Sequence, residues 1–183
     1  TIALDFDHNP DLTYGLYYAA DATLTLSDTL QGADGFIPLI FDPQGLTSEQ
    51  KAKWPHLANL NAYRIRETDI ARFKNILKGQ LAVAAGTASF TANATSVQIP
   101  GILDDLYTYT GALGATYTDT NVTVAVWAPT ARRVGLQIIT PADVTAANNI
   151  QSAAMTFDDA TGVWSATGPR AECRRGRRRR RVP

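Results

Sequence analysis

The sequence predicts a mainly β protein made of two β-sandwich, immunoglobulin-like modules, the first of which carries one or two short helices. The main observation is the alternation of Val122, Val124 and Val126 with other side chains, the period of two that is typical of a half-buried strand. A second alternating run follows at residues 134–139, and Pro129 separates the two because proline cannot donate to a sheet ladder. We therefore expect these two runs to form a hairpin at the edge of a sandwich.

Short strands separated by turn residues also dominate the first module. The Ala20-Asp21 turn and the glycines at positions 32 and 35 divide its beginning into short extended runs. From apolar and β-branched content we predict strands at residues 12–19, 22–26, 37–41, 81–85 and 96–99.

Two helices are expected in the same module. Thr47 with Gln50 three residues later matches a capping box, which opens a helix that Pro55 ends. Residues 69–78 form the second, because Ile70, Phe73 and Leu77 share one helical face.

The second module follows a break at Pro100-Gly101. Residues 103–109 carry the chain into it, and we place the boundary near residues 105–112. Its predicted strands are at residues 122–127, 134–139, 153–157 and 163–166, with turns at 141–143 and 158–162. No Gly/Ser-rich linker separates the modules, so we expect them to pack on each other.

Composition excludes several classes of protein. The 183 residues are 45% hydrophobic and 19% charged, which is ordinary for a globular chain. No apolar run approaches the roughly 20 residues of a membrane helix, and the start lacks the pattern of a signal peptide. Cys173 is the single cysteine, so no disulfide can form within the chain.

The net charge of zero conceals an uneven distribution. Eight arginines and one glutamate follow Gly168, whereas the rest of the chain carries more acidic than basic residues. The body is therefore mildly acidic, which fits an uncharged partner and argues against nucleic acid binding by the body.

Several segments beyond the alternating strands carry a resemblance to a known family. Leu113-Gly-Ala115 followed by Val126-Trp-Ala-Pro-Thr-Ala131 resembles the family 48 carbohydrate-binding module of α-1,6-glucan debranching enzymes. The further segments are His56-Leu57, Tyr63-Arg-Ile65, Leu77-Lys-Gly-Gln-Leu-Ala-Val83, Val97-Gln-Ile-Pro-Gly-Ile-Leu-Asp-Asp-Leu-Tyr107 and Gly162-Val-Trp-Ser-Ala-Thr-Gly-Pro169. Together they resemble pullulanases and limit dextrinases of glycoside hydrolase family 13 over residues 12–170.

The resemblance implies three regions. Residues 1–105 correspond to the N-terminal β module of that family, and residues 106–169 to a family 48 module that is shortened at its end. Residues 170–183 stand where the family has an aromatic strand that closes the sandwich, and we interpret this Arg-rich segment as an artefactual, disordered tail. Without that strand the module has an unpaired edge, so we expect a monomer that is prone to aggregation.

Function follows from what the resemblance includes and what it lacks. Hydrolysis of an α-1,6 bond requires two carboxylates on a rigid scaffold, which in this family is a (β/α)₈ barrel of about 250 residues. Too few residues follow the second module to form one. We therefore expect a non-catalytic N-terminal fragment of a debranching enzyme, without catalytic residues or cofactor, whose partner is an α-glucan such as amylopectin, limit dextrin or pullulan. The wording of residues 162–169 resembles plant and algal limit dextrinases, which implies a plastid location for such a source.

Aromatic side chains are the candidate carbohydrate-binding residues, because sugar rings stack on exposed aromatic faces. Trp164 follows a turn and is predicted to be an exposed platform, with packing in the core as the alternative. Trp127, within the Val-Trp-Ala-Pro run, and Tyr109, in the segment between the modules, are the other candidates. For both, burial in the core or at a module contact is the competing interpretation.

Acidic residues give weaker signals. Asp104-Asp105 and Asp158-Asp159 are adjacent pairs beside turn residues, where aspartate bonds local backbone. Residues 5–16 begin like a calcium loop, but proline replaces the required glycine and leucine the final glutamate, so no metal site is expected. Two alternative functions remain, a free-standing starch- or glycogen-binding module and nucleic acid binding through the arginines of the tail.

Overall fold

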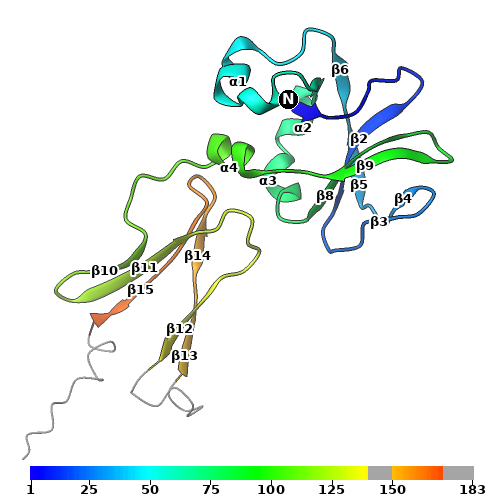
Figure 1. Cartoon of the computed structure of the whole chain (residues 1–183). Coiled ribbons are helices and arrows are strands. Elements are labelled where there is room, and N and C mark those ends of the chain that lie inside the picture. The colour runs from blue at the N-terminus through cyan, green and yellow to red at the C-terminus, as the bar shows by residue number, and fades with distance from the viewer. Residues whose placement is uncertain (140–149, 171–183) are drawn as a thin grey trace, which may run out of the picture. The chain divides into compact units, whose positions relative to one another are not determined.

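The computed structural model describes residues 1–139 and 150–170, which form two compact units that divide between Ile99 and Pro100 (Figure 1). Each unit is built mainly of antiparallel strands, as the sequence predicted. The predicted turn at 141–143 and the tail beyond Arg170 lie outside the described residues. Within those residues, no helix is both long and apolar enough to cross a bilayer.

The first unit contains a four-stranded sheet, a three-stranded sheet and a small hairpin. The four-stranded sheet has the order β5-β2-β8-β9, the three-stranded sheet the order β1-β7-β6, and the hairpin is β3-β4. The strands are β1 Ile2–Leu4, β2 Thr13–Ala19, β3 Thr25–Leu26, β4 Leu30–Gln31, β5 Gly35–Pro38, β6 Ile40–Asp42, β7 Asn61–Arg64, β8 Gln80–Gly86 and β9 Thr91–Ser96.

One face of the four-stranded sheet forms the core of this unit. Leu16, Ile37 and Val83 lie in one cross-strand row and are almost fully buried. Tyr14, on the same face of β2, places its ring 4.6 Å from that of Tyr63 in β7, so this face packs toward the three-stranded sheet. The alternation of side chains along β2 and β8 thus determines which of them are buried in this core.

The helices of the first unit are short. Helix α1 (Ser48–Lys53) has the predicted capping box, because Thr47 and Gln50 bond each other's backbone N–H groups, and a 3₁₀ turn at Pro55–Leu57 follows. The helix predicted at 69–78 is instead two single-turn helices, α2 (Glu67–Ile70) and α3 (Phe73–Ile76). Phe73 is buried but Ile70 is 52% exposed, so the predicted common face was wrong at its first residue.

Several predicted strands of this unit need correction. The run at 37–41 divides between two sheets, because β5 pairs with β2 whereas β6 pairs with β7. The strand at 22–26 shortens to β3, and the strand at 96–99 is wrong because β9 ends at Ser96. Strands β1, β4 and β7 were not predicted, since each is only two to four residues long and shows little alternation.

The second unit begins with a helix and continues with two sheets. Helix α4 (Pro100–Leu106) was not predicted, and it begins at the expected break at Pro100-Gly101. The larger sheet has the order β10-β11-β15-β14 and the smaller is β12-β13. The strands are β10 Gly114–Tyr117, β11 Asn121–Trp127, β12 Gly135–Ile139, β13 Ile150–Ala154, β14 Thr156–Asp158 and β15 Val163–Pro169.

The predicted hairpin between 122–127 and 134–139 is wrong, although both strands exist. Strand β11 pairs with β10 and β15, whereas β12 pairs with β13 in the other sheet. The turn at Pro129 therefore carries the chain between sheets. The strand predicted at 153–157 divides in the same manner at the buried Met155, because β13 and β14 belong to different sheets.

An ion pair between the buried Asp42 and the exposed side chain of Arg64 holds the end of β6 to β7. The Asp42 carboxylate accepts hydrogen bonds from Arg64 Nε at 2.7 Å and from the Gln44 backbone N–H at 3.1 Å, and Arg64 Nη2 lies 2.6 Å away. Burial of Asp42 favours its neutral form, but the hydrogen bonds and charge of Arg64 and the Gln44 N–H outweigh this effect and lower the pKa of Asp42. The carboxylate thus stabilises the folded state in its ionised form.

Arg64→Gln is expected to raise the pKa of Asp42 and to lower the melting temperature at neutral pH. The pKa of Asp42 is lower in the folded protein than in the unfolded chain, where it is about 3.9. The ion pair therefore stabilises the fold fully at a pH above the unfolded pKa, and this stabilisation is lost as the pH falls through the folded pKa. The difference in melting temperature between wild type and variant should therefore narrow below about pH 4. Thermal unfolding monitored by circular dichroism across pH measures this, and Arg66→Gln, at an exposed position two residues along, is the matched control. A difference independent of pH would contradict this role of the ion pair.

Candidate functional site

Trp164 does not form the exposed platform that the sequence predicted. It is 8% exposed, and its ring lies 4.9 Å from that of Phe157 on the neighbouring strand β14. The indole Nε1–H donates to the carbonyl oxygen of Ala128 at 3.0 Å. The packing alternative therefore holds, and Trp164 links β15 to the chain after β11.

Trp127 is half-buried at the end of β11, and a neighbouring turn fixes its orientation. Its Nε1–H donates to the Thr161 carbonyl at 3.0 Å. Within that turn, the Asp158 carboxylate accepts from the Ala160 N–H at 3.0 Å and from the Thr161 hydroxyl at 2.7 Å. Asp158 is thus a turn residue, as predicted, and the turn anchors the Trp127 ring.

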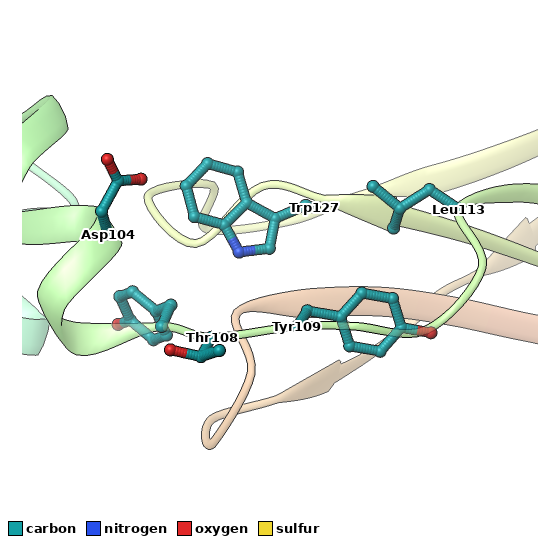
Figure 2. A pocket seen from close by; sticks show the side chains of 6 residues that line it. Asp104, Thr108, Tyr109, Leu113 and Trp127 are labelled. Atoms are coloured by element: carbon teal, nitrogen blue, oxygen red, sulfur yellow. The ribbon is translucent and has the colours of Figure 1, made fainter.

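Trp127 lines an open pocket of about 370 Å³ in the second unit. The other lining residues come from α4, from the segment that follows it and from the entrance to β10: Asp104, Tyr107, Thr108, Tyr109 and Leu113. Figure 2 shows the rings of Trp127 and Tyr109 on opposite sides of the hollow, with the Asp104 carboxylate at the α4 end and Leu113 at the other. The structure therefore brings together two of the three candidate residues, Trp127 and Tyr109.

Tyr107 is the buried base of the segment that carries Tyr109. It is 3% exposed, and its ring packs against Gly162 at the end of the 158–162 turn. A Cβ at Gly162 would lie 3.0 Å from Tyr107 Cδ1 and 2.8 Å from Pro129 Cβ, and Gly162 has φ +73°. Glycine is required here both for the backbone conformation and for the close approach of these rings.

Tyr109 remains accessible to solvent while its ring is held locally. The side chain is 37% exposed, and its hydroxyl donates to the Ala112 carbonyl at 3.3 Å. The hydroxyl lies directly over Gly111, where a Cβ would collide with it. The loop between α4 and β10 thus limits the movement of the Tyr109 ring and leaves part of it open.

The chemistry of the pocket suits binding better than catalysis. Asp104 is its single carboxylate, whereas glycosidic hydrolysis uses two on opposite sides of the bond. No group of three His, Cys, Asp or Glu side chains among the described residues could hold a metal ion. Opposed aromatic rings, a threonine hydroxyl and one carboxylate give apolar faces with hydrogen-bonding groups at their edges.

Sequence reasoning missed Asp104, Thr108 and Leu113 as lining residues. Asp104 was expected beside turn residues, bonded to local backbone, but it lies in α4. The available signal was Pro100, because proline is favoured at the first position of a helix. Leu113 and Thr108 gave no pattern of their own, since the fold alone brings them to Trp127.

Comparisons with known proteins cover nearly all of the chain. Residues 1–105 match the family described as Pullulanase N2 domain, and residues 112–178 match carbohydrate-binding module 48, the isoamylase N-terminal domain. "Pullulanase 1, chloroplastic" from Arabidopsis thaliana is 32% identical over 160 residues, which are 83% of this chain and 16% of that protein. The pullulanase of Klebsiella pneumoniae is 32% identical over 157 residues, 84% of this chain and 14% of its own length.

Solved structures agree with these matches. Klebsiella pneumoniae pullulanase complexed with maltotriose superposes with a TM-score of 0.72 and 29% identity over 86% of this chain and 14% of that one. The ligand-free enzyme gives the same TM-score and identity. The chain thus spans about one seventh of the length of these relatives.

Trp164→Ala is expected to destabilise the second unit strongly, because it leaves a cavity beside Phe157 and an unbonded Ala128 carbonyl. Loss of a buried tryptophan costs about 3–5 kcal/mol of unfolding free energy. Urea denaturation monitored by circular dichroism measures it, with Trp127→Ala as the matched control at a half-buried position. Trp164→Phe, which retains most of the packing, should fold and should lose less unfolding free energy than Trp164→Ala. Equal effects of the two alanine variants would contradict the core assignment of Trp164.

Proposed function

The chain belongs to the pullulanase family, and we propose that it is a non-catalytic N-terminal part of an α-1,6-glucan debranching enzyme whose second unit binds α-glucan. The order of the two family matches supports this assignment, because the N2 domain precedes the carbohydrate-binding module. In the complete enzyme, the bound glucan branch would be presented to a barrel that hydrolyses α-1,6 links in pullulan, amylopectin or limit dextrin. We further propose module boundaries at 1–105 and 106–169.

The observation that carries the proposal is the pair of rings facing the pocket at Trp127 and Tyr109. A pyranose ring has apolar C–H faces and a belt of hydroxyls, so it gains from an aromatic face on one side and polar groups at the rim. Trp127 is oriented by its bond to Thr161, and Tyr109 by its bond to Ala112. Rings held in advance lose little conformational entropy when a sugar binds, which favours affinity in a shallow site.

An uncharged ligand also agrees with the charge of the chain. The body is mildly acidic, and one of its carboxylates, Asp104, lines the pocket, so an anionic ligand would be repelled. Asp104 could instead accept hydrogen bonds from sugar hydroxyls at the α4 end of the pocket. For a plant or algal source we propose a plastid location, which is supported by the chloroplastic relative from Arabidopsis thaliana.

Trp127→Ala and Tyr109→Ala are each expected to weaken glucan binding by about tenfold or more, because each removes one wall of the pocket. Affinity electrophoresis through gels containing amylopectin, with β-cyclodextrin as a soluble competitor, measures the dissociation constants. Tyr117→Ala is the matched control, since Tyr117 is a 58% exposed tyrosine of the same unit that does not line the pocket. Wild-type chain that migrates without retardation would contradict the glucan-binding proposal.

The purified chain is expected to release no reducing sugar from pullulan above the blank. The pocket holds one carboxylate, and a second would be needed on the opposite side of the glycosidic bond. A reducing-end assay over a long incubation checks this. Turnover that survives further purification, and that Asp104→Asn removes, would overturn the non-catalytic assignment.

A further inference from the structure

The four-stranded sheet of the first unit has a second face, opposite the buried row of Leu16, Ile37 and Val83, and only Gly15 and Ala84 at its centre are buried. We call it the outer face, and two cross-strand rows define it. The first row is Phe36, Tyr17, Ala82 and Ser96, and the second is Pro38, Gly15, Ala84 and Ala94. Two aromatic rings thus stand on the β5–β2 side, whereas small residues occupy the β8–β9 side.

The aromatic pair of the outer face is partly accessible to solvent, because Phe36 is exposed and Tyr17 is half-buried. The Tyr17 and Phe36 rings are 5.4 Å apart and nearly parallel, at 23°, and Phe36 is 46% exposed. Both rings lean over Gly15, where an added Cβ would lie 3.0 Å from Tyr17 Cε2 and 3.1 Å from Phe36 Cδ2. The absence of a side chain at Gly15 therefore lets the two rings settle on the sheet as one apolar platform.

A groove of about 230 Å³ adjoins this platform. It lies between the β3–β4 hairpin and strands β8 and β9, and Ala82, the cross-strand neighbour of Tyr17, lines it. The hairpin is fixed over the sheet because the Leu24 N–H donates to Gln80 Oε1 at 2.8 Å and the Leu30 N–H donates to Thr91 Oγ1 at 3.0 Å. Figure 1 shows the hairpin beside the sheet.

The groove contains hydrogen-bonding groups but no charge. Its lining residues are leucines, alanines, threonines, one serine and one glutamine. Thr25 and Ser96 line the groove at exposed positions, so their hydroxyls are accessible to a ligand. An aromatic platform beside uncharged hydroxyls is complementary to a neutral polyol, and it offers nothing to a phosphate or an acidic peptide.

We propose that the outer face is a second α-glucan-binding surface, with Tyr17 and Phe36 as the stacking platform and the adjoining groove as the path of the sugar chain. This inference rests on the proposed function, because it assigns the same ligand class to a separate unit. Two weak sites on one chain bind a long polysaccharide together more tightly than either alone, since the second contact is made at high effective concentration. A short oligosaccharide should show no such gain.

The test uses the full chain in four forms: wild type, Tyr17→Ala/Phe36→Ala, Trp127→Ala/Tyr109→Ala, and the variant that combines all four changes. Retardation in amylopectin gels is measured for each, with binding of β-cyclodextrin as the single-site reference. Tyr17→Ala/Phe36→Ala is expected to bind amylopectin at least about threefold more weakly than wild type, and Trp127→Ala/Tyr109→Ala at least about tenfold more weakly. The combined variant should not be retarded. Phe90→Ala is the matched control, because Phe90 is a 45% exposed phenylalanine of the first unit outside the outer face. Circular dichroism melting verifies that every variant is folded.

Comparison of the four forms distinguishes an incorrect assignment of the outer face from an incorrect assignment of the pocket. If Trp127→Ala/Tyr109→Ala is not retarded at all, the outer face does not bind glucan, and the inference is overturned while the pocket stands. If that variant binds as well as wild type and the combined variant does not bind, glucan binding by the outer face is supported and glucan binding by the pocket is contradicted. A wild type that is not retarded overturns both. Sedimentation that reveals a dimer lost in Tyr17→Ala/Phe36→Ala would assign the outer face to self-association instead.

Discussion

The second unit depends on close packing around Gly162. Its positive φ ends the 158–162 turn, and its lack of a side chain admits the ring of Tyr107 and the ring of Pro129. The same turn presents the Thr161 carbonyl to the Trp127 indole. The sheet, the segment after α4 and the pocket wall are therefore positioned by a single site, residue 162, which only glycine can occupy without strain.

The two indoles of the second unit illustrate how backbone groups assign different roles to the same residue type. Trp127 donates its N–H to the turn after β14, and Trp164 donates its N–H to the chain after β11. Both bonds tie the same end of the larger sheet. The Trp127 ring nevertheless lines the pocket, whereas the Trp164 ring is buried and packs against Phe157. Burial of a tryptophan is thus decided by which face of the sheet it occupies.

Local signals in the sequence predicted much of the fold but not its connections. The capping box at Thr47, the alternation from Val122 and the turn at Asp158 all act within a few residues, and all were predicted from the sequence. The strands that change sheets at Leu39 and Met155 could not be seen, because a continuous extended run does not reveal which partner each half chooses. Of the candidate site, Trp127 and Tyr109 could be predicted as aromatic residues, but their opposition across a pocket required α4 and the β10 entrance to be placed.

Strands β5 and β6 are joined by a single residue, Leu39, although they belong to different sheets. Leu39 is itself buried, and its backbone N–H donates to the Tyr14 carbonyl of β2 at 2.9 Å. A joint this short has no slack, so neither sheet can slide over the other without breaking that bond. The two layers are therefore expected to unfold together, as one cooperative unit, rather than one after the other.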